Sequence, residues 1–197
     1  MAIGAILLAA GSSSRMGQSK QLLQINGQPL IIITVNAVLS AGLKNIVVVL
    51  GSNAEAHREL VEHLPIQIIT NHDWERGMGN SLKKGITHLL QSSSPLEAVI
   101  IMVCDQPLLT SEHLKKLVEK LHEKRNQIIA SQYNDTLGVP ALFDQSLFHE
   151  LLNCGDDQGA KKIIQQHKDL VKAVDFQGGE IDLDTLEDYN QFLKLKA

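Results

Sequence analysis

Residues 3–10 read IGAILLAA, an apolar run that ends at Gly11. A short apolar run closed by glycine predicts a strand that is buried on both faces. Three more runs of this kind follow at residues 45–50, 66–70 and 98–103, and segments with helical spacing separate them. Strand and helix therefore alternate at the length of βαβ units, which predicts a mostly parallel sheet with helices on both faces.

The helical segments are recognised by their ends and by their apolar spacing. Pro29 and Gly42 bracket a helix between them, although three consecutive isoleucines in that stretch also suit a strand. Asn53 and Ser111 are placed to cap two more helices. Leucines and isoleucines three to four residues apart predict a further helix over residues 79–90.

The last third of the chain is less regular but continues the same alternation. Its predicted strands are residues 128–132, 139–143 and 171–175, and its predicted helices are residues 145–152, 160–166 and 185–194. Neither an internal repeat nor a linker divides the chain. The sequence therefore predicts a single α/β domain over residues 1–197.

The composition is that of an ordinary globular protein. The 197 residues are 44% hydrophobic and 20% charged, with a formal net charge of -4. This balance argues against a nucleic-acid-binding protein, because phosphate backbones are held largely by an excess of lysine and arginine. Cys104 and Cys154 lack the spacing of a zinc site or a disulfide framework. Without a secretory signal or an apolar run near the ~20 residues that span a bilayer, we expect a cytoplasmic protein with no membrane partner.

The loop after the first strand, residues 11–20, reads GSSSRMGQSK. It is not a Walker loop, because its two glycines are six residues apart rather than five, and Ser13 breaks the GxGxxG pattern. Glycine and serine nevertheless let successive N–H groups converge on one anion, and Arg15 and Lys20 add positive charge. The loop is therefore a candidate triphosphate site. The alternative is a flexible surface loop with two solvated cations.

Carboxylates mark a second candidate site. Asp105 follows the strand at residues 98–103, and ligands of such sheets bind at the carboxyl ends of the strands. Mg²⁺ prefers one or two carboxylates together with substrate phosphates, and Asp182 or Asp184 could complete such a site. The alternatives are that Asp105 caps a helix and that the acidic residues within 182–188 stabilise the positive N-terminus of the last helix.

The first loop resembles a known family. LAAGSSSRMGQSK, which begins at Leu8, is similar to the LAAGxSSRMGxxK signature of MobA-like nucleotidyltransferases. The resemblance implies a Rossmann-like three-layer αβα sandwich of the nucleotide-diphospho-sugar transferase type. It also implies a loop that wraps a nucleoside triphosphate, with Lys20, Arg15 and Asp105 as catalytic residues. The nucleotide-binding residues that it implies here are Leu8, Ala9, Ala10, Gly11, Ser12, Ser13, Ser14, Arg15 and Lys20.

The tetrad CDQP at residues 104–107 resembles the molybdenum cofactor cytidylyltransferase branch of the family, as does Ala10. That branch transfers CMP from CTP to molybdopterin-type molybdenum cofactor and releases pyrophosphate. The resemblance implies CTP, molybdopterin cofactor and a client molybdoenzyme as partners, and Mg²⁺ on Asp105 and Asp184. Two alternatives remain: transfer of GMP or another nucleotide to a different phosphorylated acceptor, and a non-catalytic molybdenum cofactor carrier. The missing GxGxxG pattern argues against an NAD-dependent oxidoreductase.

Three weaker matches imply the rest of the site. Residues 71–82 resemble the family's N-x-x-W-x-x-G-M-x-x-S-L pattern, and residues 138–143 and 155–161 resemble its GxPxLF and GDxGAR elements. The first match implies Asn71, Asn80 and Ser81 on the base and ribose side, and the others imply Gly138, Pro140 and Asp157 at the acceptor. Each stretch also reads as an ordinary loop or turn, and Asp156 and Lys161 depart from the third pattern.

The eight histidines lack the spacing of metal ligands. His57, His63, His113 and His122 lie on predicted polar helix faces. We therefore expect these four imidazoles to be solvated rather than to hold zinc.

Overall fold

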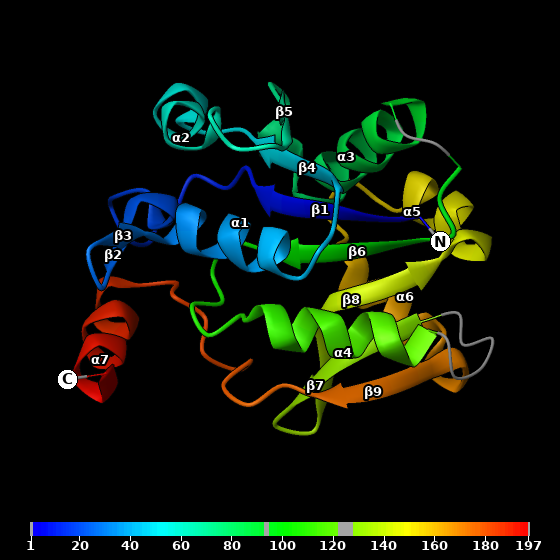
Figure 1. Ribbon diagram of the computed structural model, residues 1–197. Helices are drawn as coiled ribbons and strands as arrows, with labels where there is room; N and C mark the ends of the chain where they lie inside the picture. Colours follow the sequence, from blue (N-terminus) through cyan, green and yellow to red (C-terminus); the bar gives the residue numbers. More distant parts are fainter. Residues whose placement is uncertain (1, 93–94, 122–127, 197) are drawn as a thin grey trace.

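A computed structural model describes residues 2–92, 95–121 and 128–196. Its centre is a seven-stranded sheet in the order β5-β4-β1-β6-β8-β7-β9 (Figure 1). The strands are β1 (Ile3–Ala9), β4 (Asn45–Leu50), β5 (Gln67–Thr70), β6 (Ala98–Val103), β7 (Ile128–Tyr133), β8 (Thr136–Asp144) and β9 (Val171–Asp175). A small hairpin of β2 (Gln24–Ile25) and β3 (Gln28–Pro29) follows the first loop. The apolar runs therefore form buried strands, as their composition predicts.

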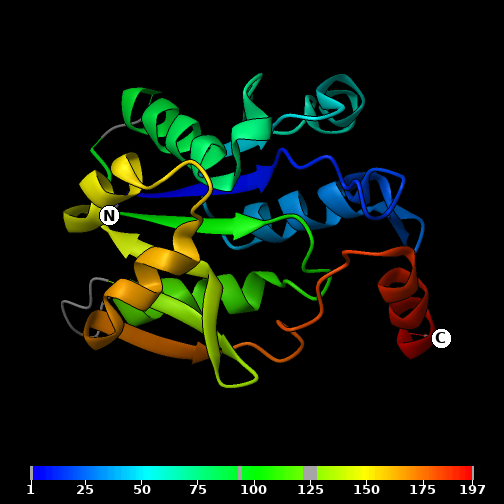
Figure 2. The ribbon, with the colours of Figure 1, turned by 180° about the vertical axis from the view of Figure 1, so that it is seen from behind.

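Helices cover both faces of this sheet, so the predicted α/β sandwich is confirmed (Figures 1 and 2). One face carries α1 (Leu30–Ser40), α2 (Ala54–Val61) and α4 (Ser111–Leu121). The other carries α3 (Met78–Ser92), α5 (Phe148–Asn153) and α6 (Ala160–Gln166), and α7 (Leu186–Lys196) ends the described chain. Alternate residues of β1 enter the two cores, with Leu7 in the core of α1 and Leu8 in the core of α3.

The sheet is mixed rather than fully parallel. β8 pairs antiparallel with β6 and with β7, whereas the other neighbours in the sheet pair in parallel. β7 and β8 form a hairpin around Asn134 and Asp135, whose φ angles are 44° and 57°. The strand expected at residues 139–143 therefore begins three residues earlier, at Thr136.

Several helix ends differ from the expectations. The segment after Pro29 is helical despite its isoleucines, and Gly42 follows its end with a φ of 84°. Ser111 is the first residue of α4 rather than its cap, because the Thr110 hydroxyl accepts a hydrogen bond from the backbone N–H of His113 at 3.3 Å. Asn53 occupies the N-cap position of α2 without a side-chain capping bond.

The described helices include none that is both long and apolar enough to cross a membrane. What matters for function is the centre of the sheet, where β1 lies between β4 and β6 and runs parallel to both. The loop after β1 and Asp105 after β6 consequently emerge side by side at one edge of the sheet.

Candidate active site

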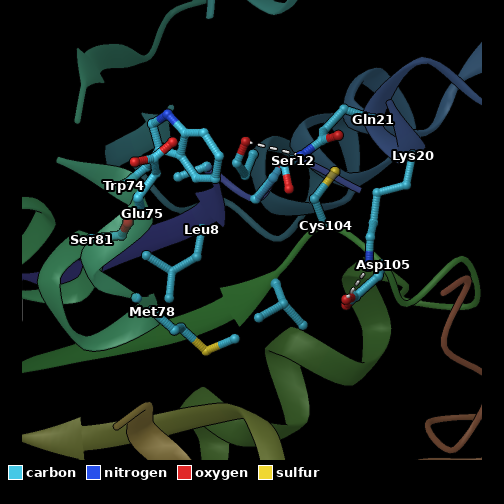
Figure 3. Close-up of a pocket in the computed structure, with 15 residues that line it drawn as sticks. Leu8, Ser12, Lys20, Gln21, Trp74, Glu75, Met78, Ser81, Cys104 and Asp105 are labelled. Atoms are coloured by element: carbon cyan, nitrogen blue, oxygen red, sulfur yellow. Dashed lines mark hydrogen bonds and ion pairs between the residues drawn. The ribbon is translucent and has the colours of Figure 1, made fainter. Parts of the chain in front are cut away.

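A cleft of about 320 Å³ opens where β1 and β6 end (Figure 3). The end of β1, the loop after it, the start of α3 and the end of β6 all contribute to its wall. The predicted nucleotide-binding residues that line it are Leu8, Ala9, Ala10, Gly11, Ser12, Lys20 and Ser81. Asp105 lines it too, so the structure brings the predicted loop and the predicted acid into one cavity.

Lys20 connects the loop to two carboxylates. Its Nζ lies 3.0 Å from Oδ2 of Asp105 and 2.9 Å from Oδ1 of Asp184. Arg15 reaches the other oxygen of Asp184, with 2.8 Å between Nη2 and Oδ2, but its side chain is 70% exposed. The four residues therefore form a chain of alternating charge that runs from the cleft to the surface.

The charges in this chain shift one another's pKa values. Burial alone lowers the pKa of Lys20, but Asp105 and Asp184 outweigh it and raise that pKa above its usual value. The hydrogen bond from Lys20 lowers the pKa of Asp184. Burial, with the nearby carboxylates of Asp105 and Asp184, raises the pKa of Asp182 to about 6. Lys20 and Asp184 are therefore both charged at neutral pH.

The segment before α7 brings Asp184 to this place. The backbone N–H of Leu183 donates to the carbonyl of Asp105 at 3.0 Å, and the Leu183 side chain is fully buried. Asp188 then accepts bonds from the backbone N–H groups of Asp184 and Thr185 at 3.2 and 2.8 Å. Asp188 thus caps α7, in agreement with the structural alternative for the acids at the helix start.

Asp105 and Asp184 provide some, but not all, of the oxygen ligands that a hard divalent cation needs. Asp105 Oδ1 is buried and has no hydrogen-bond partner in the described part of the chain, which leaves one oxygen ligand free. Across residues 2–92, 95–121 and 128–196, however, no group of three or more His, Cys, Asp or Glu side chains is placed to hold a metal ion. A divalent ion bound here would therefore need oxygen ligands from a substrate as well.

Three polar residues hold the loop, and two of them, Gln21 and Ser19, were not indicated by the sequence. Gln21 is buried, and its Nε2 donates to the carbonyls of Ala9 at 3.0 Å and Gly11 at 3.4 Å. Ser19 bonds to Gln21 Oε1 at 2.7 Å and to His57 Nε2 at 2.6 Å. Ser13, expected on the nucleotide, instead accepts a bond from the backbone N–H of Lys20 at 3.0 Å.

Two of the histidines expected to be solvated are buried. His57 has no exposed surface, and His113 is 5% exposed and bonds to Ser131 at 2.7 Å. His63 is exposed as expected, and His122 lies outside the described residues. The error arose because the polar-face pattern of a helix does not show that a neighbouring segment covers that face.

Trp74 lies at the end of the cleft opposite Lys20 and Asp105 (Figure 3). Ser81 lines the cleft, and Asn71, which is fully buried, donates to its hydroxyl at 2.9 Å. Asn80 instead lines a separate depression on the outer side of α3 with Lys83 and His88. Of the three residues expected on the base and ribose side, the structure thus places only Ser81 in the wall of the cleft.

A second cavity of about 300 Å³ adjoins the first. The two share Leu8, Met78, Val103 and Asp105. The remaining wall of the second cavity includes Asp157, which was expected at the acceptor, and the residues Gln106, Tyr133, Val139, Lys161 and Asp182. Asp105 therefore stands where the two cavities meet.

The other two residues expected at the acceptor are packed into the protein. A Cβ on Gly138 would clash with the Tyr133 hydroxyl oxygen, so glycine there makes room for that ring. Pro140 is buried, and its carbonyl accepts a bond from Ser131 at 2.6 Å. Their neighbour Val139 is the residue of this stretch that lines the cavity.

Asp156, which departs from the family pattern, has a structural partner. Its carboxylate pairs with Arg76 at 2.6 Å and with Lys83. The same loop packs closely on α3, since a Cβ on Gly79 would lie 1.9 Å from the carbonyl oxygen of Gly155. These contacts fix the loop that carries Asp157 to the wall of the first cavity.

Sequence comparisons match this chain to one protein family and to relatives of similar length. The profile of the MobA-like NTP transferase domain matches residues 5–171. The chain is 28% identical over 200 residues to nicotine blue oxidoreductase from Paenarthrobacter nicotinovorans, with 95% of each chain covered. It is 26% identical over 206 residues to purine catabolism protein PucB from Bacillus subtilis (strain 168), covering 94% of this chain and 93% of that one.

Solved structures show the same fold. The crystal structure of Rv0371c from Mycobacterium tuberculosis H37Rv matches with a TM-score of 0.85 and 28% identity, over 98% of both chains. A manganese complex of Rv0371c matches with a TM-score of 0.80 and 24% identity, over 98% of this chain and 99% of that chain.

Proposed function

This chain belongs to the MobA-like NTP transferase domain family, and from that premise we propose that it transfers CMP from CTP to molybdopterin-type molybdenum cofactor and releases pyrophosphate. The observation that carries the proposal is the position of the Lys20–Asp105 pair. Its atoms are 3.0 Å apart, and Asp105 belongs to both cavities. A nucleotide in the first cavity and an acceptor in the second would meet at this pair.

The proposed reaction depends on charge and position more than on covalent catalysis. A terminal phosphate oxygen of the acceptor attacks the α-phosphorus of CTP, and the bond from that phosphorus to the pyrophosphate oxygen breaks. A phosphate monoester is largely ionised near neutral pH, so the chain needs no strong base. Lys20 and Arg15 would neutralise the triphosphate, and the loop N–H groups would orient it.

Cys104 lines the first cavity but is unsuited to be a nucleophile. Burial, with the adjacent carboxylate of Asp105, raises the pKa of its thiol to about 12. Only the thiolate form attacks electrophiles effectively. Direct transfer between the two substrates therefore suits this site better than a covalent enzyme intermediate.

Asp105 and Asp184 are the residues that would hold a divalent ion. The free oxygen of Asp105 and the manganese complex of Rv0371c support this assignment. When bound, Mg²⁺ would stabilise the charge that develops on the phosphate oxygens. Lys20 would then turn from the carboxylates to the triphosphate.

The choice of CTP rests on the family branch that Ala10 and the CDQP tetrad at residues 104–107 resemble. Ala10 lines the cleft, and a Cβ on Gly51 would lie 2.8 Å from the Ala10 Cβ and 2.7 Å from the Trp74 Cβ. The cleft wall is therefore tightly packed around the Ala10 methyl. Ala10 therefore supports CTP through its resemblance to the cytidylyltransferase branch.

The test is a panel of four nucleoside triphosphates with Mg²⁺ and molybdopterin cofactor, in which pyrophosphate release is measured. We expect release with CTP, and a lower preference for CTP over GTP in Ala10→Gly. Release with another nucleotide alone would reassign the donor. Binding of molybdopterin cofactor without pyrophosphate release would favour a non-catalytic cofactor carrier. Because one relative is named an oxidoreductase, a separate measurement of NADH binding tests that class.

A further inference from the structure

His57 is a buried polar residue outside the cleft that the proposed reaction does not use. It lies on α2 with no exposed surface, and its Nε2 is 2.6 Å from the hydroxyl oxygen of Ser19. Ser19 in turn bonds to Gln21, so the two residues that flank Lys20 in the chain are linked to α2. Which group donates and which accepts each hydrogen bond between His57, Ser19 and Gln21 follows from the donor and acceptor atoms present.

The assignment begins at Gln21. Its side-chain nitrogen faces the carbonyl oxygens of Ala9 and Gly11, which can only accept hydrogen bonds. This fixes the amide orientation, so Oε1 faces Ser19 and must accept the single hydroxyl proton of that residue, over 2.7 Å. The Ser19 oxygen therefore accepts its second bond from His57, which carries its proton on Nε2.

The other ring nitrogen of His57, Nδ1, bears on the protonation state of the ring. His57 Nδ1 is buried and has no hydrogen-bond partner among the residues that the structure describes. Burial also lowers the pKa of His57, because a charged imidazolium would lack solvent there. The ring is consequently neutral at neutral pH, with Nε2 as its donor.

The chain of bonds joins both ends of the loop to the body of the protein. Gln21 ties the start of the loop to its end, and Ser19 ties that end to α2. Lys20 lies between these two residues, and its backbone N–H is held by Ser13. The direction of the Lys20 side chain toward Asp105 thus depends on the same bonds.

On the basis of the proposed function, we infer that His57, acting through Ser19 and Gln21, positions the nucleotide loop and Lys20 for triphosphate binding. His57 is a positioning residue, because it is not among the residues that line either cavity and acts through its bond to Ser19. Another side chain that places an N–H donor at the position of His57 Nε2 could make the same bond to Ser19. Gln, whose Nε2 can take the place of the imidazole Nε2, is therefore the matched conservative substitution.

The experiment compares His57→Leu, His57→Gln, Ser19→Ala and the double variant His57→Leu/Ser19→Ala with the wild type. CTP binding in the presence of Mg²⁺ is followed through the fluorescence of Trp74, the single tryptophan, which lines the cleft. Turnover with molybdopterin cofactor and thermal unfolding are measured on the same proteins. His63→Leu, a substitution of an exposed histidine near the end of α2, is the matched control.

We expect His57→Leu to weaken CTP binding about tenfold, His57→Gln to restore most of it, and His63→Leu to change nothing. Because His57 acts through Ser19, the double variant should bind CTP no more weakly than whichever single variant binds it more weakly. If His57→Leu does not fold, His57→Gln and Ser19→Ala still decide: binding within twofold of wild type in Ser19→Ala overturns the inference.

Multiplied effects in the double variant, or equal binding by the Leu and Gln variants, would also overturn it. A wild type that binds CTP but releases no pyrophosphate contradicts the proposed reaction, while the binding data still judge the role of His57. A wild type that binds no nucleoside triphosphate overturns both.

Discussion

At the scale of single residues, the Lys20 ammonium group lies beside the two carboxylates that a divalent ion would also bind. Its ammonium group lies between oxygens of Asp105 and Asp184, at 3.0 and 2.9 Å. These carboxylates are also the hard oxygen ligands that a divalent ion prefers. Lysine and metal would therefore compete for the same two carboxylates until a triphosphate offers Lys20 another anionic partner.

This competition predicts opposite effects on metal binding and on turnover. Lys20→Met should bind Mn²⁺ about threefold more tightly, because it removes a cation whose partly exposed ion pairs contribute up to ~1 kcal/mol. Turnover should nevertheless fall by about a hundredfold or more, since the triphosphate loses its lysine. Calorimetric titration with Mn²⁺ and a pyrophosphate assay measure the two quantities.

Asp105→Asn is the matched comparison, and it should lose both metal affinity and turnover while keeping its thermal stability. Weaker Mn²⁺ binding in Lys20→Met than in the wild type would show that the lysine does not compete for these carboxylates.

The sequence indicated Lys20 and Asp105 because each follows a recognisable strand and belongs to a specific motif. It did not indicate Gln21 or His57, because nothing local distinguishes a buried glutamine or histidine from a solvated one. Their roles depend on a contact between residues 19 and 57, which only the folded chain brings together. The bond between the Ser13 hydroxyl and the backbone N–H of Lys20 could not be predicted for a related reason, and a contact of Ser13 with the nucleotide stays a prediction.

At the scale of elements, the start of α7 carries an active-site residue. Leu183 is tied to the Asp105 carbonyl, and Thr185 and Asp188 exchange capping bonds at the helix N-terminus. Asp184 lies between these anchors and receives the Lys20 ammonium. The helix start therefore positions Asp184 as well as stabilising the helix.

Asp188→Ala should accordingly affect both stability and metal use. We expect the free energy of unfolding to fall by about 1 kcal/mol from the lost cap. The Mg²⁺ concentration for half-maximal turnover should rise about threefold, because the Asp184 backbone loses its Asp188 partner. Chemical denaturation and Mg²⁺-dependent rates measure these effects, and Glu187→Ala, at an exposed neighbouring position, is the control. An unchanged Mg²⁺ requirement in Asp188→Ala would limit the cap to a structural role.

At the scale of the whole molecule, the sequence predicted the layers better than the strand directions. Buried strands give continuous apolar runs, so β4 and β6 could be placed with the right bounds. The reversal of β8 was not predicted, because an apolar run carries no information about its direction. The polar pair Asn134–Asp135 was the available signal, since such residues adopt the positive φ angles of tight hairpin turns. A single domain over residues 1–197 stays a prediction.

His113 makes overall stability depend on pH. It joins α4 to β7 and to the segment after β9, bonding to Ser131 at 2.7 Å and stacking on Phe176 with 4.3 Å between ring centres. Burial, with a smaller effect of Lys116, lowers the pKa of His113 to about 4, against 6.5 for an unperturbed histidine. Between these values the unfolded chain binds a proton that the folded chain does not, so stability is complete above about pH 6.5 and declines as the pH falls.

We therefore expect the free energy of unfolding to drop by on the order of 2–3 kcal/mol between pH 7 and pH 4 through this residue. His113→Gln, which keeps a donor but does not titrate, should lack this part of the pH dependence. Chemical denaturation of both proteins at several pH values isolates the contribution, since the other titrating groups cancel in the difference. Equal slopes in the two proteins would contradict the assignment.

The two cavities draw their walls from different stretches of the polypeptide. All the residues that line the first lie between Leu8 and Asp105, whereas most of the wall of the second comes from residue 105 onward. Substitutions of residues that line only the second cavity, such as Tyr133, Val139 and Lys161, can therefore alter the acceptor end while the lining of the first cavity is kept. Acceptor specificity can thus diverge among related chains around a constant nucleotide end, and of the four residues that the cavities share only Asp105 is charged.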